Sequence, residues 1–187
     1  MIKLHRIISS IIIFFLLVKT GSSQQLFRCE NGVVRFSSYA PQELLSASSP
    51  KLIGFVNPSS REFAFIVNIS SFEGFNAALQ RDHFNENYLE SSKFPEASFK
   101  GKIIEEFDFT KEGVYHVRAK GILKIHGVEQ ERIIKGTVHV EKNDILIQSK
   151  FIVLLKDHNI RIPKVVHEKV ASEIEVSLEE RMVKKNK

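Results

Sequence analysis

The chain has 187 residues, of which 43% are hydrophobic and 26% are charged, and its formal net charge is +5. This length fits a single domain with its own core, and the hydrophobic content excludes a largely disordered chain. Cys29 is the only cysteine, so an internal disulfide is also excluded.

The first residues have the layout of a secretory signal peptide. Lys3 and Arg6 precede an apolar run over residues 7–18, and small residues suited to cleavage follow near Ser23. We therefore expect a signal peptide over residues 1–23. An uncleaved N-terminal anchor is the alternative.

Removal of the leader changes the charge balance of the remaining domain, residues 24–187. The leader contains Lys3, Arg6 and Lys19 and no acidic residue, so its loss lowers the net charge from +5 to +2. The sequence also has no dense basic patch interleaved with aromatic residues. Both observations argue against nucleic acid as a partner.

Strand-like alternation of apolar and polar residues dominates the rest of the chain. The eight predicted strands cover residues 33–38, 51–56, 61–70, 97–109, 113–128, 132–141, 145–157 and 167–180. Short turns join several of them, which indicates antiparallel pairing. The last segment has the glutamate content of a helix, but its apolar residues alternate from Val170 to Leu178, so we predict a strand.

Residues 70–97 break this two-residue rhythm. Phe72, Phe75 and Leu79 recur at helical spacing, with Ser71 as a candidate N-cap, and an irregular stretch over Phe84–Tyr88 follows. We expect a short helical insertion that covers one end of the fold. Eight antiparallel strands fit a sandwich or a closed barrel, and closure has the advantage of removing exposed edges.

The inward-facing rows of five strands each mix small residues with large apolar ones. We take these rows to be odd-numbered residues in 97–103, 115–125 and 147–155, and even-numbered residues in 132–140 and 170–178. Small residues in mid-strand would leave an apolar channel if the strand registers bring them together. The alternative is that glycine supplies barrel corners and close packing, with a filled interior.

The sequence offers little support for catalysis, a metal ion or a cofactor. It has no HExxH or CxxC motif, no GxSxG motif and no glycine-rich phosphate loop. An enzyme acting on a lipid-like substrate would have to use His83 with Asp82 or Glu86, whose side chains would then point into the channel. We therefore predict a protein that is not an enzyme, with no cofactor and no metal. The roles of Cys29 and the histidines stay open.

Several stretches resemble the YceI-like family of bacterial exported proteins. They are RDHFNENYLESSKFPEASFKGKI, GVYHVRAKGILKIHGV and FIVLLKDHNIRIP, and the resemblance runs from about Val33 to Leu178. Its more specific parts are the triplet Asp82–His83–Phe84, the pair Phe94–Pro95, the turn Gly121-x-Leu123-x-Ile125-His126-Gly127-Val128, and the segment Asp157–Pro163. The stretches FSSYAPQELLSASS and KLIGFVNPSSREF depart from many relatives and leave the ligand open.

The resemblance implies a lipocalin-like antiparallel barrel in the periplasm whose interior tunnel binds a polyisoprenoid or another long-chain lipid. It supplies no catalytic residues. On this basis we expect an exported carrier or sequestering protein, with a non-catalytic barrel with a filled core as the alternative. We also expect transient membrane contact, and the oligomeric state is left open, a dimer being one option.

The predicted ligand-binding residues are Phe65, Val67, Phe99, Gly101, Val117, Ala119, Gly121, Gly136, Ser149, Phe151 and Ile174. A bulky residue at Gly121 should block the channel.

Overall fold

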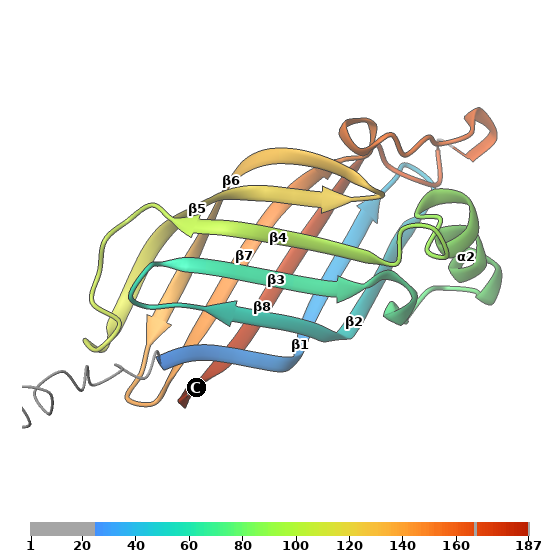
Figure 1. Ribbon diagram of the computed structural model, residues 1–187. Helices are drawn as coiled ribbons and strands as arrows, with labels where there is room; N and C mark the ends of the chain where they lie inside the picture. The colour runs from blue at the N-terminus through green and yellow to red at the C-terminus, as the bar shows by residue number, and fades with distance from the viewer. Residues whose placement is uncertain (1–24, 167, 187) are drawn as a thin grey trace, which may run out of the picture.

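The computed structural model describes residues 25–166 and 168–186, and the predicted signal peptide lies outside them. Eight antiparallel strands form a closed barrel in which each strand pairs with its neighbours in sequence and β8 closes onto β1 (Figure 1). The strands are β1 (Gln25–Tyr39), β2 (Leu44–Val56), β3 (Glu62–Asn68), β4 (Glu96–Ile103), β5 (Gly113–Ile125), β6 (Val128–Val140), β7 (Asp144–Leu154) and β8 (Glu173–Asn186). The predicted all-β barrel is confirmed, and the sandwich is not formed.

Alternation along each strand decides which side chains enter the barrel. In β5, Val117 and Leu123 are buried while His116 and Lys120 are exposed. The predicted rows face inward within the strands, because an apolar residue at every second position keeps one face of the sheet out of water. The last row is the exception at its start, since Val170 and Ser172 precede β8 and Ser172 is exposed.

Several strand boundaries differ from the sequence prediction: β1 begins at Gln25 instead of residue 33, and β8 covers Glu173–Asn186 instead of residues 167–180. β2 begins at Leu44, whereas the predicted strand began at residue 51. The added residues include Ala47 and Ser49, which are both buried, and Ser49 Oγ lies 2.6 Å from Ser71 Oγ. The predicted strand 97–109 ends at Ile103. Beyond it Phe109 packs over Phe27, with ring centroids 5.9 Å apart, so this stretch covers the barrel interior instead of extending the sheet.

The helical insertion is present but starts later than predicted. A 3-10 turn, η2 (Ile69–Ser71), precedes the helix α2 (Ala78–His83), and a π-helical turn, η3 (Phe84–Tyr88), follows it. Ser71 does not cap α2; its hydroxyl donates to the Asn68 carbonyl instead. Two further 3-10 turns, η4 (Leu155–His158) and η5 (Lys164–Val166), lie between β7 and β8.

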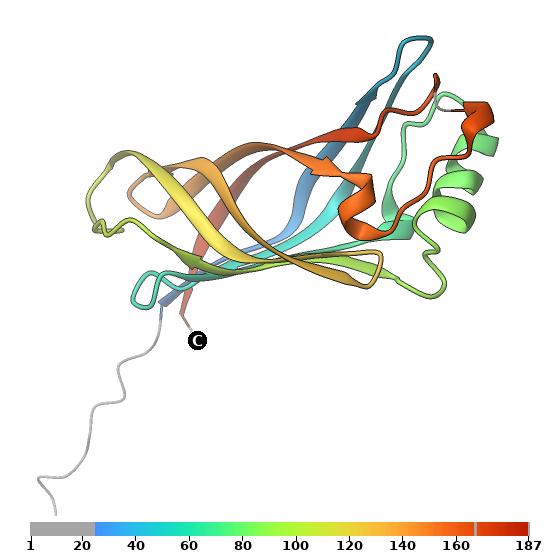
Figure 2. The same cartoon turned by 90° about the horizontal axis from the view of Figure 1, so that it is seen from above.

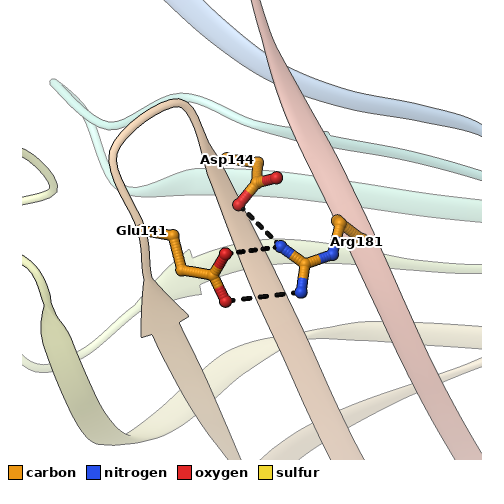
Figure 3. A network of polar contacts seen from close by, with 3 residues as sticks. All are labelled: Glu141, Asp144 and Arg181. Atoms are coloured by element: carbon orange, nitrogen blue, oxygen red, sulfur yellow. Dashed lines mark hydrogen bonds and ion pairs between the residues drawn. The ribbon is translucent and has the colours of Figure 1, made fainter.

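The two ends of the barrel differ. α2, η5 and the β1–β2 turn lie at one end, which we call the mouth end, and both ends of the described chain lie at the other, which we call the closed end (Figures 1 and 2). At the closed end Arg181 of β8 pairs with Glu141 and Asp144 of the β6–β7 turn, at N–O distances of 2.7 and 2.9 Å (Figure 3). No helix in the described part of the chain is long and apolar enough to cross a bilayer.

Candidate ligand cavity

The barrel is filled in one half and hollow in the other. Near the closed end a continuous core includes Phe63, Val138, Ile145 and Met182, all buried. Toward the mouth end lies a cavity of about 370 Å³. Its size falls in the range of small-molecule sites, roughly 300–1,000 Å³.

The cavity wall is almost entirely apolar. Strands β1, β2, β3, β4, β5, β7 and β8 contribute to it, together with η2, η3 and the β7–β8 connection. Its polar residues include Glu43, Gln80, His83 and Lys169, and these four are only partly buried or exposed, so they lie at the opening. The interior is therefore suited to a hydrocarbon chain and the opening to a polar end.

Five of the eleven predicted binding residues line this cavity. They are Phe65, Val67, Phe99, Phe151 and Ile174. The structure brings them together from β3, β4, β7 and β8. Their contact with a ligand stays a prediction.

Three predicted residues, all glycines, do not line the cavity. Gly101 and Gly121 face each other across β4 and β5, where an added Cβ would lie 2.1 Å from Lys120 O and 2.3 Å from Lys100 O, respectively. At Gly136 an added Cβ would lie 2.8 Å from Gln148 O. These glycines let neighbouring backbones approach closely, so the space that a side chain would need is taken by backbone and is not open cavity.

The other three predicted residues belong to the filled half or to the wall itself. Val117 is part of the closed-end core, and Ala119 packs against that core. Ser149 pairs with Gly136 across β6 and β7, and its hydroxyl donates to Lys135 O at 2.8 Å. The small residues are adjacent, as the registers require for a channel, but they lie away from the hollow half.

Aromatic residues missing from the predicted binding set make up much of the cavity wall beneath the cover. Phe36 of β1 stacks on Phe84, with centroids 5.3 Å apart, and contacts Phe72 and Phe75. Phe72, Phe75 and Phe84 were predicted as cover residues, and the alternation within 33–38 was the available signal for Phe36. Leu79, also predicted to cover the opening, is instead exposed on α2.

The cover is fastened to the barrel by a cluster that we call the His126 clasp: Glu90, His126 and His158. His126 Nε2 lies 2.7 Å from Glu90 Oε2, and Nδ1 lies 3.0 Å from the His158 carbonyl oxygen. The clasp joins the segment after η3, the β5–β6 turn and η4. Neighbouring residues Leu89 and Ile125 line the cavity, so the clasp holds part of its wall in place.

Two buried ionisable groups lie outside the cavity. Burial raises the pKa of the Cys29 thiol to about 12, with the nearby Glu180 charge adding to the shift, so the thiol stays protonated at neutral pH. His158 is fully buried beneath the β5–β6 turn, and burial lowers its pKa. Both groups are therefore kept neutral by desolvation.

The hypothetical catalytic residues do not form a cluster inside the cavity. His83 lies at the opening, whereas Asp82 and Glu86 are exposed and do not line the cavity. Among the described residues neither carboxylate makes a hydrogen bond or ion pair with His83. In the same part of the chain no three His, Cys, Asp or Glu side chains come together as metal ligands.

The fold and cavity define a class: a closed antiparallel barrel of lipocalin type with one apolar internal site. The model of the YceI-like domain matches residues 42–181, three quarters of the chain, and the chain belongs to this family. The predicted family is confirmed. No curated protein matches the chain in sequence.

Solved structures share the fold at low sequence identity. A polyisoprenoid-binding domain from Saccharophagus degradans, implicated in plant cell wall breakdown, has a TM-score of 0.67 and 10% identity, covering 89% of this chain and 100% of its own. BcnA of Burkholderia cenocepacia has a TM-score of 0.67 and 13% identity, covering 81% and 96%. The YCEI protein of Campylobacter jejuni has a TM-score of 0.54 and 16% identity, covering 73% and 80%.

Proposed function

We propose that this chain binds the hydrocarbon tail of a long-chain amphiphile, of the polyisoprenoid class, in the cavity at the mouth end. The observation that carries the proposal is a 370 Å³ cavity with an almost entirely apolar wall, whose charged side chains, Glu43 and Lys169, lie at the opening. The similar barrel from Saccharophagus degradans, a polyisoprenoid-binding domain, supports the choice of ligand class.

Energetics favour an apolar occupant. Each methylene moved from water into the cavity contributes about 0.8 kcal/mol, and ordering the chain offsets part of that gain. A long chain therefore binds tightly without specific polar contacts.

The proposal is for an exported, non-catalytic protein that sequesters or carries its lipid. Export rests on the signal-peptide layout of residues 1–23, and a periplasmic location is the corresponding proposal. The absence of an acid partner for His83 among the described residues supports binding without chemistry.

The test is lipid content and uptake of the purified chain. Organic extraction and mass spectrometry should recover a long-chain lipid, and the emptied protein should take up an added long-chain polyprenol. The variant Ile174→Phe, which fills the cavity, should weaken uptake at least tenfold. Its matched control is Ile152→Phe, on the outer face of the neighbouring strand β7, which should bind as the unmodified protein does.

The proposal fails on two outcomes. One is a lipid-free extract together with no polyprenol uptake by the unmodified protein. The other is equal loss of uptake in the two variants while both stay folded by circular dichroism.

A further inference from the structure

The three most exposed large apolar side chains of the described chain all lie at the mouth end. Val165 of η5 is 90% exposed, Tyr39 at the end of β1 is 63% exposed, and Leu79 of α2 is 61% exposed. Leu44, at the start of β2, is 57% exposed. We call these four residues the mouth rim.

The mouth rim directly surrounds the cavity opening. Each of its members is the immediate chain neighbour of a residue that lines the cavity; the pairs are Tyr39 and Ser38, Leu44 and Glu43, Leu79 and Gln80, and Val165 and Val166. Within each pair one side chain turns toward the cavity and the other is exposed to solvent. The exposed apolar side chains therefore flank the opening, where three of the four lining partners, Ser38, Glu43 and Gln80, are polar.

Hydrogen bonds join the three parts of the rim into one surface. Gln42 N–H donates to the Glu168 carbonyl at 2.9 Å, which fastens the β1–β2 turn to the segment after η5. Asn76 Nδ2 donates to Leu44 O at 3.1 Å, and Gln80 donates to the Glu43 carboxylate, which fastens the same turn to α2. Figure 2 shows the turn, α2 and η5 projecting from the same end of the barrel.

Charges of both signs surround the apolar residues. Exposed cations include Arg81, Arg161 and Lys169, and nearby carboxylates include Glu43, Asp82 and Glu168. A polyanion would meet repulsion from the carboxylates. Zwitterionic phospholipid headgroups, which carry a phosphate and an ammonium, complement both signs.

We infer that the mouth rim docks on the surface of a phospholipid bilayer. Its apolar side chains enter the interface between headgroups and acyl chains, and the cavity opening then faces the acyl region. A hydrocarbon tail can pass between bilayer and cavity without crossing water, which would otherwise hydrate every methylene. This inference rests on the proposed lipid-binding function and adds the membrane as the partner of the opening.

Flotation with phosphatidylcholine vesicles tests the inference. The unmodified protein should float with the vesicles, and the triple variant Leu44→Ser, Leu79→Ser, Val165→Ser should lose at least tenfold in vesicle partitioning. The matched control is Val114→Ser, Ile133→Ser, Val183→Ser, which removes three apolar side chains away from the mouth that are 57%, 56% and 47% exposed. The control should partition within twofold of the unmodified protein.

Uptake of farnesol from solution separates docking from lipid binding. The triple mouth variant should still take up farnesol within twofold of the unmodified protein, because the cavity wall is unchanged. If no form takes up farnesol, the proposed function fails, and the flotation result alone decides the docking surface.

Three outcomes overturn the docking inference. The first is vesicle partitioning of the mouth variant equal to that of the unmodified protein, and the second is equal loss in the control. The third is an unmodified protein that does not float but forms a dimer that the mouth variant makes monomeric, which would assign the rim to a second copy of the chain.

Discussion

Gly101 and Gly121 show how a single absent side chain shapes the barrel wall. The two residues are directly paired across β4 and β5, and at each of them a Cβ would collide with the backbone of the other strand. A small residue in mid-strand can leave space for a ligand, or it can let a neighbouring strand approach closely. Gly101 and Gly121 do the latter, because backbone atoms occupy the volume that their side chains would need.

We expect Gly121→Ala to destabilise the fold by about 1–3 kcal/mol, because the added methyl overpacks against Lys100 O. Gly121→Phe should disrupt strand pairing and not merely block the cavity. The measurement is the free energy of unfolding in urea. Gly74→Ala is the control, because a Cβ there meets nothing within 4 Å and only its backbone φ of +92° opposes the change, at a cost of about 1 kcal/mol. Equal stability of Gly121→Ala and the unmodified protein would contradict this account.

At the scale of elements, the cover over the cavity is a separate unit held by few polar contacts. One of these is the His126 clasp, in which the His126 side chain is only 11% exposed. Glu90 and His126 have φ values of 43° and 52°, in the left-handed region that costs a non-glycine residue about 1–2 kcal/mol. The clasp therefore offsets backbone strain on both sides of the joint.

Removing the clasp should loosen the cover while leaving the barrel intact. We expect Glu90→Gln to cost about 1 kcal/mol at this joint, because the hydrogen bond to His126 keeps an acceptor oxygen but loses its charge. Hydrogen exchange followed by mass spectrometry should show faster exchange in residues 84–94 and 126–128, with β6 and β7 unchanged. Glu86→Gln, on the exposed face of η3, serves as the control. Exchange that rises equally throughout the barrel would refute a local role for the clasp.

At the scale of the whole molecule, the barrel divides its length between stability and binding. The closed-end core is dense, and the ion-paired cluster of Arg181, Glu141 and Asp144 joins β8 to the β6–β7 turn there. The mouth half holds the cavity and the cover. The tightly packed half can supply the free energy of folding. The other half can therefore keep an apolar cavity, which costs stability because its wall lacks packing contacts.

The closed-end cluster should make stability depend on pH at the acid end. Hydrogen bonds from Arg181 hold the pKa of Glu141 below its usual value of 4.5, so the folded state favours the ionised carboxylate. That contribution is present above pH 4.5 and is lost as the pH falls through the lowered folded-state pKa. Glu141→Gln should therefore lower Tm more at pH 7 than at pH 3.

Salt should shrink the effect, because all three side chains are partly exposed. Glu86→Gln, which removes an exposed acid of η3 at the mouth end, controls for the change in net charge. A Tm difference of the same size at pH 7 and pH 3 would show that Arg181 does not act through the charge of Glu141.

The predictable features were those that depend on local periodicity. The eight strands and their inward rows follow from alternation that each segment carries by itself, as in Tyr115 to Ile125. Five of the predicted wall residues line the cavity for the same reason. The start of α2 was misplaced because Ala77, its N-cap residue, makes no side-chain capping bond, so the sequence carries no signal there.

The sequence by itself determined the family, through motifs spread along the chain, and the face that each strand turns inward, because that face depends on residues one or two positions away. Only the tertiary structure decided which half of the barrel is hollow. Val117, Gly136 and Ser149 are paired across β5, β6 and β7 and lie beside the filled core. Phe151 of β7 and Ile174 of β8 belong to strands with the same alternation, yet they line the cavity. Free volume depends on what side chains from several strands, the cover and the 104–109 segment leave unfilled together, and no single strand contains that information.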